Sequence, residues 1–150
     1  MPYFSVAFAR SDAGWIGTEI DLSEVAGVDD ITDIMRETAV ETAASTVVLL
    51  VEQEDEWFAV VRLDDGEDPR VFLSDPRATL TSDLARMLHE QIGEIDEVPT
   101  DDPVGDPALL TDLGTDAARL TELGERRLPG DALSVIADRG GFADDYERLR

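Results

Sequence analysis

One run of residues restricts the fold of this chain more than any other feature. Residues 46–51 read TVVLLV, so they are almost entirely β-branched and aliphatic and lack the polar alternation of a half-exposed strand. Such a run is typical of a strand that is buried on both faces. The sequence therefore predicts a β-sheet with residues 46–51 as a central strand.

Four further segments are predicted to be strands of the same sheet. Residues 3–9 mix aromatic and β-branched residues, and turn-forming residues 11–14 separate them from the segment 15–20, which predicts a hairpin. Residues 57–63 and 70–73 follow the central strand, and acidic turns separate the three. We therefore expect about five mainly antiparallel strands.

Two helices are expected beside these strands. Apolar residues recur at helical spacing from Asp29 or Asp30 to about residue 44, and either aspartate can serve as the N-cap. Asp75 and Pro76 can begin a second helix, whose apolar positions extend to Ile92. The predicted fold is α+β in the order β-β-α-β-β-β-α, an order that resembles the longin and roadblock scaffolds.

The last third of the chain differs in composition from the rest. Residues 93–107 combine acidic residues with proline and glycine, which predicts an extended linker. Short helical patterns then follow at 108–113, 117–123 and 132–137. We therefore expect an α+β domain over residues 1–92, the linker, and a small helical lobe over residues 108–150. This lobe has few apolar residues, so it should dock on the sheet or on a partner.

Charge restricts the classes of function. The 150 residues carry 35 carboxylates against 12 cations, all of them arginine, which gives a formal net charge of −23. Phosphate recognition depends on Lys and Arg, so direct binding to nucleic acid is not expected. Long-range attraction would instead favour a basic protein partner. Because 43% of the residues are hydrophobic, a folded core is still predicted.

Motifs for catalysis or ligand binding are sparse. The chain has no cysteine, which excludes disulfides, thiolate zinc sites and thiol nucleophiles, and without lysine it can form no phosphate-binding P-loop. His89 is the only histidine and is predicted to be a partly exposed structural residue. The acidic clusters within residues 52–56 and 64–68 lack EF-hand spacing and are predicted to be solvated turns. We expect no catalytic residue, no cofactor and no metal site.

The sequence also predicts a location. No apolar run approaches the ~20 residues that span a membrane. No basic segment precedes the first apolar stretch, as it would in a secretory signal. The chain is therefore expected in the cytoplasm, with no membrane contact.

Six side chains are candidates for a partner-binding surface, because aromatic rings and guanidinium groups are enriched at protein interfaces. They are Trp57, Arg62, Arg70, Phe72, Phe142 and Tyr146. Two alternatives stay open. The aromatic residues can belong to the core, and the arginines can simply pair with nearby carboxylates.

Five segments together resemble a known family. They read EDEWFAVVR at 54–62, DPRVFLSD at 68–75, GDPxLLxDLG at 105–114, LPxDAL at 128–133 and RGGFAD at 139–144. This pattern resembles the tRNA adenosine deaminase-associated proteins of actinobacteria, and it spans most of the chain. The family is named for the closeness of its genes to that of the deaminase that makes inosine in the tRNA anticodon. No catalytic residues are established for it.

The resemblance implies a pathway and not a reaction. Our interpretation is a non-catalytic acidic accessory or adaptor protein that binds or regulates a tRNA adenosine deaminase. One alternative is a carboxylate-based hydrolase or a metal-dependent enzyme whose acidic residues converge only in three dimensions. Another is an acidic mimic of nucleic acid that occupies the phosphate path of a different protein.

Overall fold

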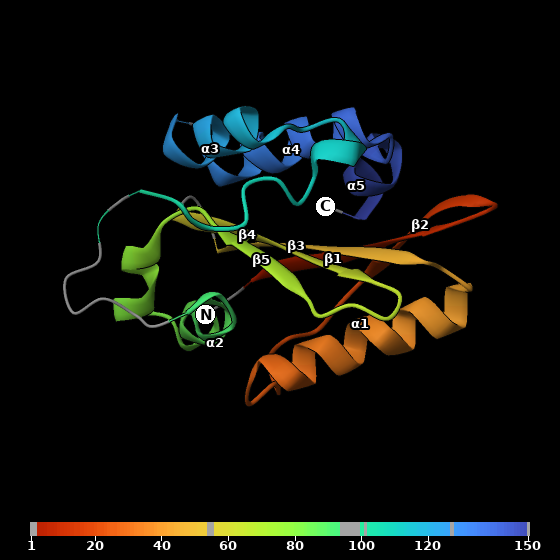
Figure 1. Ribbon diagram of the computed structural model, residues 1–150, viewed down its shortest axis with the longest axis horizontal. Helices are drawn as coiled ribbons and strands as arrows, with labels where there is room; N and C mark the ends of the chain where they lie inside the picture. Colours follow the sequence, from red (N-terminus) through yellow and green to blue (C-terminus); the bar gives the residue numbers. More distant parts are fainter. Residues whose placement is uncertain (1–2, 54–55, 94–99, 101, 127, 150) are drawn as a thin grey trace.

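An antiparallel sheet lies between two layers of helices in the computed structural model, which describes residues 3–53, 56–93, 100, 102–126 and 128–149 (Figure 1). Six strands are found among these residues, in the spatial order β2-β1-β3-β4-β5-β6. Their bounds are β1 (Phe4–Ser11), β2 (Gly14–Glu19), β3 (Thr46–Gln53), β4 (Trp57–Asp64), β5 (Arg70–Leu73) and β6 (Val104–Gly105). The α+β class is therefore confirmed, with six strands in place of the five expected.

Strand β3 is central and is buried along its whole length, as its continuous apolar run predicts. Its alternate residues serve two separate cores. Val48 and Leu50 face the layer of C-terminal helices, whereas Val47, Leu49 and Val51 face the layer that contains α1 and α2. Two-sided burial thus explains why the polar alternation of an ordinary strand is missing here.

The first helical layer consists of α1 (Val28–Thr42), the 3-10 helix η1 (Pro76–Leu80) and α2 (Asp83–Ile92). The predicted second helix is therefore two helices, because Ser82 adopts an extended conformation and its hydroxyl accepts a hydrogen bond from the Ala85 N–H, which begins α2. Helix α1 is capped at Gly27, which supplies no side-chain bond, and not at Asp29 or Asp30. Asp30 instead accepts a hydrogen bond from the backbone N–H of Ala26.

The second layer covers the opposite face of the sheet and comes from the C-terminal third of the chain (Figure 1). It contains η2 (Thr111–Leu113), α3 (Ala117–Arg126), α4 (Pro129–Gly140) and α5 (Ala143–Leu149). Phe142 stacks on Phe8 of β1 with ring centroids 4.2 Å apart, and the Tyr146 ring meets Phe4 edge-on. The helical segment therefore packs directly on the sheet.

The region predicted as a linker contains part of the sheet. Val104 and Gly105 form β6, which pairs with β5 and so adds a sixth strand to its edge. Two further details differ from the prediction. The helix within residues 108–113 is a 3-10 helix of only three residues, and α5 is a helix that was not expected. The division into domains over residues 1–92 and 108–150 stays a prediction.

Among the described residues, none of the helices is both long and apolar enough to cross a bilayer.

Candidate functional site

Arg62 lies near the end of β4, on the face of the sheet that the C-terminal helices cover. It follows Phe58 and Val60 at two-residue spacing, and both of these belong to the core on that face. The register of β4 with β5 sets Arg62 opposite Arg70. Two like charges in opposing positions destabilise a sheet, so this pair needs acidic partners.

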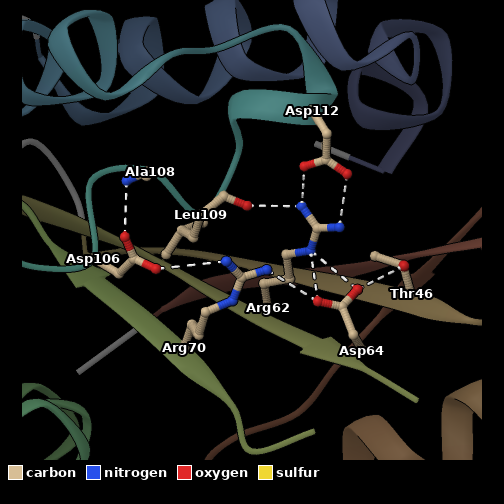
Figure 2. A network of polar contacts seen from close by, with 8 residues as sticks. All are labelled: Thr46, Arg62, Asp64, Arg70, Asp106, Ala108, Leu109 and Asp112. Carbon is tan, nitrogen blue, oxygen red and sulfur yellow. Dashed lines mark hydrogen bonds and ion pairs between the residues drawn. The ribbon is translucent and has the colours of Figure 1, made fainter. Parts of the chain in front are cut away.

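Asp64 is a carboxylate shared by the two arginines. It lies two residues after Arg62 on the same face of β4 and opposite Thr46 of β3. Its oxygens accept hydrogen bonds from Arg62 Nε at 3.1 and 3.2 Å, from Arg70 Nη2 at 3.0 Å and from Thr46 Oγ1 at 2.8 Å (Figure 2). The register of three adjacent strands is therefore enough to assemble this group.

The segment before α3 completes the coordination of Arg62 from above the sheet (Figure 2). Arg62 Nη1 donates to the carbonyl oxygen of Leu109 at 2.8 Å, and Nη2 donates to Asp112 Oδ2 at 2.9 Å, while the second oxygen of Asp112 accepts from Nη1. The Arg62 side chain is only 8% exposed, but that of Asp112 is 61% exposed. Arg62 thus ties β4 to a distant part of the chain through a two-pronged ion pair.

Arg70 makes a second link to the same segment. Its Nη1 lies 3.6 Å from Asp106 Oδ2, and the other oxygen of Asp106 accepts a hydrogen bond from the backbone N–H of Ala108 at 2.9 Å. The Arg70 side chain is 39% exposed, so this pair is partly solvated. We refer below to the following residues as the arginine cluster: Thr46, Arg62, Asp64, Arg70, Asp106 and Asp112.

The charges of this cluster are mutually stabilised. Burial alone would raise the pKa of Asp64, but the hydrogen bond from Thr46 and the charge of Arg62 outweigh burial, so its pKa lies below the usual value. The hydrogen bond from Arg62 lowers the pKa of Asp112, and the same bond raises the pKa of Arg62. All three groups hold their charges at neutral pH, which suits a fixed ionic clamp better than proton transfer.

The four aromatic candidates all lie inside the protein. Trp57, Phe72, Phe142 and Tyr146 are each no more than 2% exposed, and Trp57 Nε1 donates a hydrogen bond to Gln53 Oε1 at 3.0 Å. They pack in the two cores and are not presented at the surface in this fold. Their predicted use in partner binding is untested, and it would require the layers to separate.

The two arginine candidates differ in access. Arg62 is buried and bonded, whereas Arg70 reaches the surface and lines two pockets, one at the turn between β4 and β5 and one among β5, β6 and the end of α2. A third pocket, of about 300 Å³, lies between this turn and the C-terminal end of α1. The structure therefore brings Arg62 and Arg70 together, and of these two it leaves only Arg70 accessible.

Other candidates for chemistry are placed as follows. His89 is buried in α2, and its Nδ1 lies 3.3 Å from the carbonyl oxygen of Gly93, so it is less exposed than expected. Of the acidic turn at 52–56, residues 54 and 55 lie outside the described residues. The described part of the chain holds no group of three or more histidine or carboxylate side chains that could share a metal ion.

Sequence reasoning missed the acidic half of the arginine cluster. Asp106 lies 36 positions after Arg70 and Asp112 lies 50 positions after Arg62, and no local spacing connects the two segments. The signal that could have found them is the segment GDPxLLxDLG at 105–114, where both aspartates occur in a family-like motif beside apolar residues. The pocket at the end of α1 has no such signal.

Comparison with known proteins identifies one family. The model of the Rv3753c-like tRNA adenosine deaminase-associated protein family matches residues 3–143, which include the sheet, the helices up to α4 and the whole arginine cluster. The search of curated proteins returned no match. The search of solved structures returned none either.

Proposed function

Because the chain belongs to the Rv3753c-like tRNA adenosine deaminase-associated protein family, we propose that it is a non-catalytic accessory protein that binds a tRNA adenosine deaminase. The observation that carries this proposal is the family match over residues 3–143 in a chain with a net charge of −23. The family name supplies the association with the deaminase, and the charge suggests the physical basis of a complex.

A protein that binds tRNA must present cations to the phosphates, so its surface carries a positive potential. An acidic protein is attracted to such a surface over long range, which speeds association and disfavours other acidic partners. The arginine cluster strengthens the negative character of the surface, because Arg62 and Arg70 are paired with carboxylates of the same chain. The proposed role would place the protein in the cytoplasm, where tRNA is modified.

The proposal of a non-catalytic role draws on the chemistry of the described groups. The lowered pKa values of Asp64 and Asp112 make both carboxylates poor proton donors near neutral pH. His89 is 6% exposed and packs within α2, away from open solvent. Asp64, Asp112 and His89 therefore stabilise the fold, and their arrangement favours partner binding over catalysis as the function.

The test is co-purification of the chain with the tRNA adenosine deaminase of the same organism. We expect a complex at low salt that weakens at moderate salt, since charge attraction between exposed groups is screened. Size-exclusion chromatography of the mixed proteins would measure it, and an unrelated protein of similar negative charge serves as the control. Absence of any complex at both salt concentrations would refute the proposed function.

A further inference from the structure

The outer face of α1 is an uncovered and strongly acidic surface. One side of α1 packs on the sheet through Ile31 and Met35, and the other side faces away from the protein (Figure 1). The exposed carboxylates of that side recur at four-residue intervals, at Asp29, Asp33, Glu37 and Glu41. Four-residue spacing places side chains one above another along a helix, so these carboxylates form a stripe.

The stability of α1 does not explain this stripe. Like charges at four-residue spacing repel each other, and a glutamate near a helix C-terminus opposes the helix dipole. Glu41 is in that position, and the last turn of α1 contains no basic residue. Arg36 is the one cation of α1, and the described residues offer it no ion pair within 4 Å. Asp29 in the first turn suits the helix dipole, but the carboxylates that follow it towards the C-terminus are unfavourable for the helix alone, and a cationic partner would offset their repulsion.

A pocket of about 300 Å³ lies beside the C-terminal end of this stripe. Its apolar lining comes from Ala39, Val40 and Ala44 on the helix side and from Leu63 of β4. Val40 is 80% exposed, the largest exposure among the exposed large hydrophobic side chains of the described chain. A helix position that faces water gains nothing from valine, because a β-branched residue is a weaker helix former than lysine or glutamate.

The polar edge of the pocket carries charges of both signs, because Arg36 lines it together with two aspartates. Asp64 and Asp65 both line it, but Asp64 is already bonded to Arg62 and Arg70. Asp65 is exposed, and no ion pair links it to the rest of the described chain. The last carbonyl groups of α1 add partial negative charge at the same end. The pocket thus offers a partner an apolar floor, with the Asp65 carboxylate and the Arg36 guanidinium at its edge.

We infer that the outer face of α1 and the apolar floor of this pocket together form the docking surface for a cationic face of the deaminase. This inference rests on the proposed function and adds the location of the contact. The choice of partner chemistry follows from charge complementarity, since the stripe, the helix end and Asp65 are all negative.

The experiment compares three variants by titration of the purified tRNA adenosine deaminase, with fluorescence anisotropy of the labelled chain as the readout. The first variant, Asp33→Asn/Glu37→Gln/Glu41→Gln, removes three charges of the stripe. The matched control, Glu125→Gln/Asp138→Asn/Glu147→Gln, removes three exposed charges from the opposite helical layer. The third variant, Val40→Arg, places a cation at the mouth of the pocket.

We expect the stripe variant to bind at least about fivefold more weakly than the wild-type chain, and the control to stay within about twofold, because only the stripe would face the partner. Val40→Arg should weaken binding at least about tenfold, since it fills the pocket and repels a cation. Thermal unfolding of each variant checks the fold, and the stripe variant should unfold no earlier than wild type because repulsion within α1 is relieved.

The outcomes separate the two proposals. If the wild-type chain binds and the stripe, pocket and control variants bind equally well, the docking surface is wrong while the proposed function stands. If the control weakens binding more than the stripe variant, the contact lies on the opposite layer and the inference is also overturned. If the wild-type chain shows no binding at low salt, both proposals fail.

Discussion

Replacement of Arg62 by methionine should destabilise the protein by about 2–4 kcal/mol. Methionine fills a similar shape without a charge, so the change removes the guanidinium and little packing. The carbonyl oxygen of Leu109 then loses its partner, in a residue with no exposed surface, and an unsatisfied buried acceptor costs about 1–3 kcal/mol. Asp64 keeps Thr46 and Arg70, so its charge stays paired.

Replacement of Asp112 by asparagine should cost less, about 0.5–1.5 kcal/mol. Arg62 would keep its bonds to Asp64 and Leu109, and the Asp112 side chain is 61% exposed, so solvent screens the lost charge. If Asp112 acts only through Arg62, the double variant should be no less stable than Arg62→Met alone. Urea unfolding of all four proteins at pH 7 measures the free energies and the coupling between the two sites.

The pH dependence of this pair has a definite sign. Because the hydrogen bond from Arg62 lowers the folded-state pKa of Asp112, its contribution is present above the unfolded pKa of about 3.9 and is lost as pH falls through the folded value. The stability difference between wild type and Asp112→Asn should therefore be constant from about pH 5 to 8 and should shrink below about pH 4. A constant difference down to about pH 2, or an Arg62→Met variant as stable as wild type, would refute this account.

Two backbone positions give further predictions. Ala43 ends α1 in the left-handed region at φ 54°, so Ala43→Gly should stabilise the protein by up to about 1 kcal/mol, measured as a higher midpoint of thermal unfolding; a lower midpoint would contradict the strain. Gly114 has φ 93°, and a Cβ there would lie 2.6 Å from the carbonyl oxygen of Arg139, so Gly114→Ala should cost about 2 kcal/mol or more. In that case urea unfolding is the measurement, and no loss of stability would show that the contact relaxes freely.

The sheet could be predicted from sequence because burial on two faces leaves a direct record. The continuous apolar run of β3 and the aromatic and β-branched residues of β1 and β4 are visible without any tertiary information. Strand β6 left no such record, since Val104 and Gly105 lie among Asp, Pro and Gly and pair only because β5 offers a free edge. The break between η1 and α2 depends on a single cap at Ser82, and the periodicity of apolar residues does not reveal this cap.

The candidate site could be predicted only in part. Arg62 and Arg70 were identified by residue type, but their carboxylate partners depend on how residues 106–112 cross the sheet, which no local pattern specifies. Aromatic residues are as common in cores as at interfaces, so residue type alone does not tell whether Trp57 and Phe142 lie in the core or at the surface. The pocket at α1 depends on the approach of the β4–β5 turn to a helix end, and such an approach exists only in three dimensions.

The split of the sheet into two cores has a consequence for biosynthesis. The core beneath α1 and α2 is built from residues that leave the ribosome first, whereas the core on the other face needs Leu120, Leu133 and Phe142 from the last part of the chain. Until those residues emerge, the row that includes Phe8, Leu50 and Val60 has no cover, and nascent chains with such a face attract chaperones or one another. Premature termination before α3 would therefore release a sheet with one apolar face uncovered. We expect such a fragment to aggregate or to bind chaperones during translation.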